Sequence, residues 1–120
     1  MNWPRYVYIA GPYTRPNPNH NVHATIKVAD EVLAMGFIPY VPHLSHFWDT
    51  MSPHHYEDWM QLDFAWIARC DVLIRLPGES SGADREVEHA KRLEIPVFYG
   101  LEAFQRFIDA QRMSGEDRRS

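Results

Sequence analysis

Residues 71–91, DVLIRLPGESSGADREVEHAK, decide the fold because they predict a buried strand that turns directly into a helix. Residues 71–76 are nearly all apolar, as expected of a central strand in a parallel sheet. Pro77-Gly78 ends the strand, and Ser81-Gly-Ala-Asp84 supplies a capping pattern for the helix that follows. A helix N-terminus offers unpaired N–H groups and a partial positive charge, so a ligand can approach the main chain at this turn.

Glu86 is the first candidate for chemistry. At 100° per residue, Ala83, Val87 and Ala90 form a narrow apolar stripe on the predicted helix. Glu86 flanks this stripe and leans toward the sheet edge, whereas Glu88 points toward water. The favourable helix dipole alone also explains a glutamate at this place, so a structural and a functional interpretation both stay open here.

The rest of the chain alternates strands with helices. Strands are expected at residues 6–10, 37–41 and 96–99, and Pro39 indicates an edge strand. Helices are expected over about residues 20–35, capped by Asn19 or Asn21, and over residues 56–70 and 101–113. The alternation predicts one α/β domain with a parallel sheet of four to five strands over residues 1–113, followed by a polar, frayed tail at residues 114–120.

Three loops are expected to meet where ligands bind in such sheets, at the carboxyl ends of the strands: residues 11–15, 42–55 and 80–86. Residues 42–55 are predicted to be an irregular lid or functional loop. This loop holds four histidines, which suggests zinc, but no cysteine or carboxylate pattern fixes a ligand geometry, and no metal is expected. A packed lid or a base-contacting role is favoured for His46, Phe47 and Trp48.

Composition excludes several classes of protein. The chain has 120 residues, 23% of them charged and 45% hydrophobic, which is the balance of an ordinary globular domain. A formal net charge of −4 does not favour binding to duplex nucleic acid. No apolar run in the sequence is long enough to span a membrane. The first residues do not read as a signal peptide, and the single Cys70 fits a reducing compartment. We therefore expect a cytoplasmic protein.

Asp63 is the second informative carboxylate. It falls between Trp59 and Ile67, within the apolar arc of its predicted helix, whose inward face is expected to carry Trp59, Leu62, Trp66 and Cys70. A buried carboxyl costs energy unless it is paired or used, and a tyrosine hydroxyl or a backbone group would satisfy it. Two inward carboxylates on separate helices at one sheet edge also match the chemistry of glycosidic bond cleavage.

Three segments resemble the nucleoside 2-deoxyribosyltransferase family and the related 2′-deoxynucleoside 5′-monophosphate N-glycosidases. They are Tyr8-Ile-Ala-Gly-Pro-Tyr13, Asp63-Phe-Ala-Trp-Ile-Ala-Arg-Cys-Asp71 and Ser80-Ser-Gly-Ala-Asp-Arg-Glu86, and the similarity runs from about Tyr6 to Tyr99. The resemblance implies a flavodoxin-like or Rossmann-like fold, a nucleoside or nucleotide substrate, no cofactor, and a homo-oligomer, either a dimer or larger.

The resemblance also implies roles for individual residues. Glu86 would attack C1′ of the sugar, Asp63 would act on the base, and Tyr13 would lie near the nucleophile. Ser80 replaces an acid that is typical of the transferases, which favours a 5′-phosphate at the helix N-terminus. The substrate-binding set is then Gly11, Pro12, Arg15, His46, Ser80, Ser81 and Gly82.

Several alternatives remain open from the sequence. Hydrolysis and base transfer differ only in whether water or a second base intercepts the intermediate. A nucleotide-sensing module without catalysis, or a structural domain with an aromatic interface loop, fits the same pattern. For catalysis, Glu86 is expected to be ionised at neutral pH, helped by the helix N-terminus.

Overall fold

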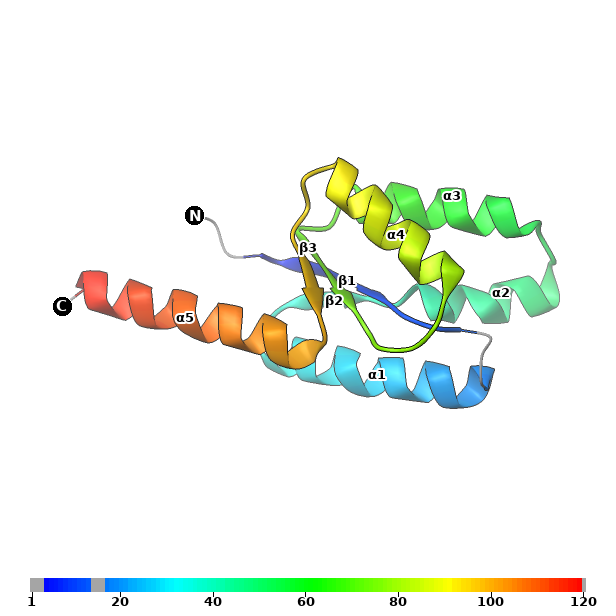
Figure 1. Cartoon of the computed structure of the whole chain (residues 1–120). Helices are drawn as coiled ribbons and strands as arrows, with labels where there is room; N and C mark the ends of the chain where they lie inside the picture. The colour runs from blue at the N-terminus through cyan, green and yellow to red at the C-terminus, as the bar shows by residue number, and fades with distance from the viewer. Residues whose placement is uncertain (1–3, 14–16, 120) are drawn as a thin grey trace.

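The centre of the fold is a parallel sheet between two layers of helices (Figure 1). The computed structural model describes residues 4–13 and 17–119, except the side chains of His46 and of residues 115–119. The strand order is β2-β1-β3-β4, with β1 at Tyr6–Ala10, β2 at Ile38–Tyr40, β3 at Val72–Arg75 and β4 at Val97–Tyr99. This is the order found in flavodoxin-like folds, so the predicted fold class is confirmed.

The central strand β1 divides the core into two layers because its side chains alternate between the faces of the sheet. Val7 and Ile9 pack with α1 (Pro18–Ala34) and α5 (Leu101–Arg119). Tyr8 and Ala10 pack with α3 (Tyr56–Ile67) and α4 (Ser81–Arg92) on the opposite face. Tyr8 therefore points toward the two helices that carry the candidate carboxylates.

The helix pattern of α4 agrees with the sequence. Ala83, Val87 and Ala90 are buried against the sheet, Glu86 is buried beside them, and Glu88 is exposed. The cap is one residue earlier than expected, because the Ser80 Oγ accepts a hydrogen bond from the Ala83 N–H at 3.1 Å. The expected edge position of β2 is also confirmed.

Helix α1 begins earlier than predicted. Its cap is Asn17, rather than Asn19 or Asn21, and the Asn17 side chain accepts a hydrogen bond from the His20 N–H at 3.1 Å. Pro18 then takes the first helical position, where its missing N–H costs nothing. Pro18 therefore starts the helix directly after its cap.

The prediction of an irregular loop at residues 42–55 is wrong in part, because this segment contains a 3₁₀ turn, η1 (Pro42–Leu44), and a short helix, α2 (Ser45–Met51). The last helix also exceeds its predicted end at Met113 and continues to Arg119. Gly115 weakens a helix by roughly 1 kcal/mol but no proline interrupts this one, so residues 114–119 are helical. In Figure 1, α5 extends beyond the sheet.

The buried face of α3 is offset from the predicted stripe. Met60, Asp63 and Ile67 are its buried residues, whereas Trp66 is 45% exposed. Trp66 instead stacks on Tyr40 of the edge strand, with ring centroids 5.1 Å apart. The helix ends at Ile67, so Cys70 lies beyond it. Among the helices of residues 4–13 and 17–119, none is long and apolar enough to cross a membrane.

Candidate active site

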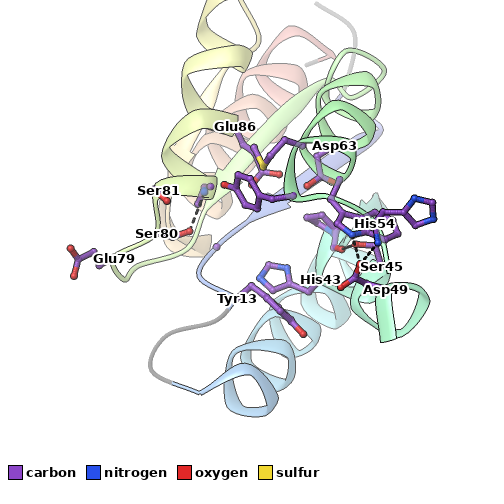
Figure 2. Close-up of a pocket in the computed structure, with 17 residues that line it drawn as sticks. Tyr13, His43, Ser45, Asp49, His54, Asp63, Glu79, Ser80, Ser81 and Glu86 are labelled. Atoms are coloured by element: carbon purple, nitrogen blue, oxygen red, sulfur yellow. Dashed lines mark hydrogen bonds between the residues drawn. The ribbon is translucent and has the colours of Figure 1, made fainter. Parts of the chain in front are cut away.

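A pocket of about 720 Å³ lies at the carboxyl edge of the sheet, a volume suited to a small-molecule ligand. The loops that follow β1, β2 and β3 form its wall together with α2, α3 and α4 (Figure 2). The three segments that the sequence assigned to one edge therefore do meet there.

Glu86 and Asp63 face one another in this pocket (Figure 2). Glu86 comes from α4 and is 5% exposed, and Asp63 comes from α3 and is 9% exposed. The two helices are linked on their outer side, where Arg85 donates hydrogen bonds to both carboxylate oxygens of Glu57 at 2.6 and 3.1 Å. The packing of α3 against α4 thus sets the position of each carboxyl relative to the other.

Tyr8 completes this group, and sequence reasoning did not single it out. Its hydroxyl donates a hydrogen bond to Oε2 of Glu86, and the whole side chain is buried in β1. Burial, followed by the charge of Glu86, raises the pKa of Tyr8 well above its usual value, so the hydroxyl keeps its proton. The signal in the sequence was a tyrosine in a central strand, since a buried hydroxyl needs a partner.

Burial also changes the acidity of both carboxyls. It raises the pKa of Asp63 to about 6, against an ordinary value of 3.8. Burial first, and then the charge of Asp63, raise the pKa of Glu86 well above its ordinary value, while Tyr8 and Arg75 act in the opposite direction. Two adjacent buried carboxyls titrate as a pair, and each makes the second ionisation of the pair harder. The expectation that Glu86 is ionised at neutral pH did not take account of this burial and of Asp63, which both raise its pKa.

The turn between β3 and α4 is held by Arg75. Its guanidinium donates to the backbone oxygens of Leu76 and Gly78, the latter at 2.9 Å, and to Oδ1 of Asp84 at 3.1 Å. Gly78 has φ +118°, and a Cβ at this residue would lie 2.6 Å from Cγ of Pro12. The turn therefore packs tightly against the loop that follows β1.

The predicted substrate-binding residues are only partly brought together. Ser80, Ser81 and Gly82 line the pocket at the N-terminus of α4, and Gly11 lines it after β1. A Cβ on Gly11 would lie 3.1 Å from Cβ of Leu76, so packing within the protein already demands a small residue there. Arg15 lies outside the described residues, and so does the side chain of His46.

Tyr13 and Pro12 both contact His43. Tyr13 lines the same pocket, but the tyrosine that is hydrogen-bonded to Glu86 is Tyr8. In Figure 2, Tyr13 lies beside His43, away from Glu86, and the Tyr13 and His43 rings meet edge to face with centroids 6.0 Å apart. The carbonyl oxygen of Pro12 is 3.0 Å from Nε2 of His43.

Sequence reasoning missed Asp49 as a wall residue. Its Oδ1 accepts hydrogen bonds from Nε1 of Trp59 at 2.7 Å and from the His54 N–H at 2.9 Å. These bonds hold the end of α2 against α3, so residues 45–59 form a structured wall. Within the described part of the chain, no group of three or more His, Cys, Asp or Glu side chains is arranged to hold a metal ion.

Together the fold and site define a flavodoxin-like α/β domain with a buried carboxyl pair in a pocket at the carboxyl edge of its sheet. Residues 5–100 match a family described as a domain of unknown function (DUF7768), and the chain belongs to this family. The matched residues span β1 to β4, and thus include Tyr8, Asp63 and Glu86. No curated protein matches the chain.

Proposed function

We propose that this protein cleaves the N-glycosidic bond of a nucleoside, a deoxynucleoside or the corresponding 5′-monophosphate. The observation that carries the proposal is the carboxyl pair of Asp63 and Glu86, contributed by two helices to one pocket. Glycosidic cleavage uses one carboxyl that carries a proton and one that is ionised. The resemblance of the segments around Tyr8, Asp63 and Glu86 to the nucleoside 2-deoxyribosyltransferases supports the substrate class.

In the proposed reaction, Glu86 attacks C1′ through an oxocarbenium-like transition state. The electrons of the bond between C1′ and the base nitrogen leave with the base, which takes a proton from Asp63. Water, or a second base, then displaces Glu86 from C1′, which gives overall retention. The reaction needs a proton on Asp63 and the charge on Glu86. The Tyr8 hydroxyl and the charge of Arg75 favour the ionised form of Glu86, against burial and the charge of Asp63, which raise its pKa.

The N-terminus of α4 is the proposed site for the 5′ end of the substrate. Ser80, Ser81 and Gly82 line the pocket at this end, where backbone N–H groups and the helix dipole favour an anion. In the same proposal the protein is a cytoplasmic homo-oligomer, and light scattering on the purified chain measures the number of subunits.

A nucleotide-binding module without catalysis is the second candidate. The raised pKa of Glu86 favours it, because a protonated carboxyl is a hydrogen-bond donor to a ligand and a poor nucleophile. Such a module binds nucleosides or nucleotides in calorimetry but releases no base.

A chromatographic screen for free base separates these functions. The purified protein is incubated with nucleosides, deoxynucleosides and their 5′-monophosphates, with and without a second base as acceptor. Release without an acceptor indicates hydrolysis, and release only with one indicates transfer.

The matched variants in this screen are Glu86→Gln and Glu88→Gln, which change two glutamates of the same helix. We expect Glu86→Gln to reduce the rate at least about 100-fold, as is common for the loss of a catalytic group. The exposed Glu88→Gln variant should retain the wild-type rate. A Glu86→Gln protein as fast as wild type would remove Glu86 from the mechanism.

A further inference from the structure

His43 is a buried side chain of the pocket wall to which the proposed reaction assigns no role. It lies in η1, after the edge strand β2, and is 5% exposed. Its Nε2 is 3.0 Å from the carbonyl oxygen of Pro12. A carbonyl oxygen only accepts hydrogen bonds, so Nε2 carries the hydrogen of this contact.

This contact determines what the other ring nitrogen does. Burial lowers the pKa of His43 below its ordinary value, and the ring is therefore neutral at physiological pH. In a neutral imidazole with hydrogen on Nε2, Nδ1 is a hydrogen-bond acceptor. Nδ1 is buried and has no hydrogen-bond partner among the residues that the structure describes. Leaving such a group unpaired is unfavourable, and most buried polar atoms are paired.

The same pocket contains another buried polar atom that lacks a hydrogen-bond partner. Oδ1 of Asp63 also has no hydrogen-bond partner within the described part of the chain. His43 and Asp63 both line the pocket but come from different elements, η1 and α3. A ligand in this pocket therefore meets unpaired polar atoms from two different elements.

We propose that His43 is a specificity-determining residue, and that its Nδ1 accepts a hydrogen bond from an O–H or N–H group of the bound substrate. This inference rests on the function proposed above. In a nucleoside, we infer that the donor is the 2′- or 3′-hydroxyl of the sugar or an exocyclic amino group of the base. His43 lines the pocket, and its ring meets the ring of Tyr13, another lining residue, edge to face.

Two substitutions separate the two ring nitrogens. In His43→Gln, the side-chain amide reaches the position of Nε2 and retains a donor for the Pro12 carbonyl, but it places no acceptor at Nδ1. In His43→Asn, the shorter amide places its oxygen near Nδ1 and does not reach Pro12. The first variant tests the ligand contact, and the second retains an acceptor. Thermal melting of both shows whether either is folded.

The probes are pairs of compounds that differ by one donor. Adenosine with purine riboside tests the amino group, 2′-deoxyadenosine with 2′,3′-dideoxyadenosine tests the 3′-hydroxyl, and adenosine with 2′-deoxyadenosine tests the 2′-hydroxyl. Dissociation constants are measured by calorimetry in a Glu86→Gln background, where bound substrates persist, and base release is measured with Glu86 present.

In the otherwise unchanged Glu86→Gln protein we expect the compound that lacks the relevant donor to bind about 5- to 100-fold more weakly. His43→Gln should remove the preference for one pair only, which identifies the donor, and His43→Asn should keep it. An unchanged preference in His43→Gln for all pairs would overturn the assignment while base release still supports the enzyme. Binding without base release would overturn the enzyme but still test His43. Failure of every compound to bind would overturn both.

Discussion

Replacing Asp63 by asparagine should stabilise the protein at neutral pH, because it removes a carboxyl that burial makes costly to ionise. Burial raises the pKa of Asp63 in the folded protein from 3.8 to about 6. Below pH 3.8 the group is protonated in both the folded and the unfolded states, so it adds no penalty. Between the two values the unfolded chain loses its proton first, and the folded state loses relative stability as the pH rises.

The size of the effect follows from the same values. A difference of about 2 in pKa, at about 1.4 kcal/mol for each pKa unit, gives a penalty of about 3 kcal/mol that is fully developed above pH 6. Asparagine has nearly the same shape, and its amide can donate a hydrogen bond to Glu86. For a domain of this size, 1 kcal/mol corresponds to roughly 3–5 °C in Tm, so the gain is about 10 °C.

The assay is thermal unfolding of the wild type, Asp63→Asn and Glu88→Gln between pH 3.5 and 8. The Tm difference between Asp63→Asn and the wild type should be small at pH 3.5 and should grow to its full value by pH 7. Glu88 is exposed, so Glu88→Gln should follow the wild-type curve. A constant difference between Asp63→Asn and the wild type across this range would show that Asp63 is not a buried carboxyl of raised pKa, and the carboxyl pair would lose its support.

Two further substitutions test the surroundings of the pair. Tyr8→Phe removes the hydrogen bond that lowers the pKa of Glu86. The acid limb of the pH–rate profile should therefore move to higher pH, and the rate should fall about 10-fold or more. Tyr40→Phe is the control, and identical pH–rate profiles for both variants would show that Tyr8 has only a structural role. Gly78→Ala should destabilise the protein by about 2–4 kcal/mol in denaturant titrations, since it combines φ +118° with a Cβ 2.6 Å from Pro12. Gly100→Ala, with φ +94° and no atom within 4 Å of its Cβ, should cost only about 1 kcal/mol, and equal losses would contradict the role of Pro12.

The sequence predicted the carboxyl positions because burial follows the helical period. The position of Glu86 beside the apolar stripe of α4 follows from the sequence of that helix alone. The position of Asp63 within the apolar arc of α3 follows in the same way from the sequence of α3. Tyr8 escaped notice because strand alternation does not say which helices cover which face. That information arises only when β1 is placed between the layers.

Local sequence patterns could not predict the pKa shift of Glu86 or the short helix α2, because both depend on contacts between separate segments of the chain. The pKa of Glu86 depends on Asp63, a residue 23 positions earlier that reaches it only through the packing of α3 on α4. Helix α2 has seven residues, too few for a reliable period, and it is held by the bonds that Asp49 makes to Trp59 and His54. Asn17 was not among the caps predicted for α1, and the helix begins directly after it at Pro18.

The link between α3 and α4 has a consequence for stereochemistry. In carboxyl-based glycosidic cleavage, the spacing of the two groups decides between retention and inversion of the sugar. Here that spacing is set by the angle and distance between two helices, and not by the sheet. Arg85, paired with Glu57 and placed over the rings of Tyr56 and Phe64 at 5.7 and 5.6 Å, holds those helices together from outside the pocket. In the proposed reaction, the stereochemistry of the product would thus depend partly on the ion pair of Arg85 and Glu57 on the surface of the molecule.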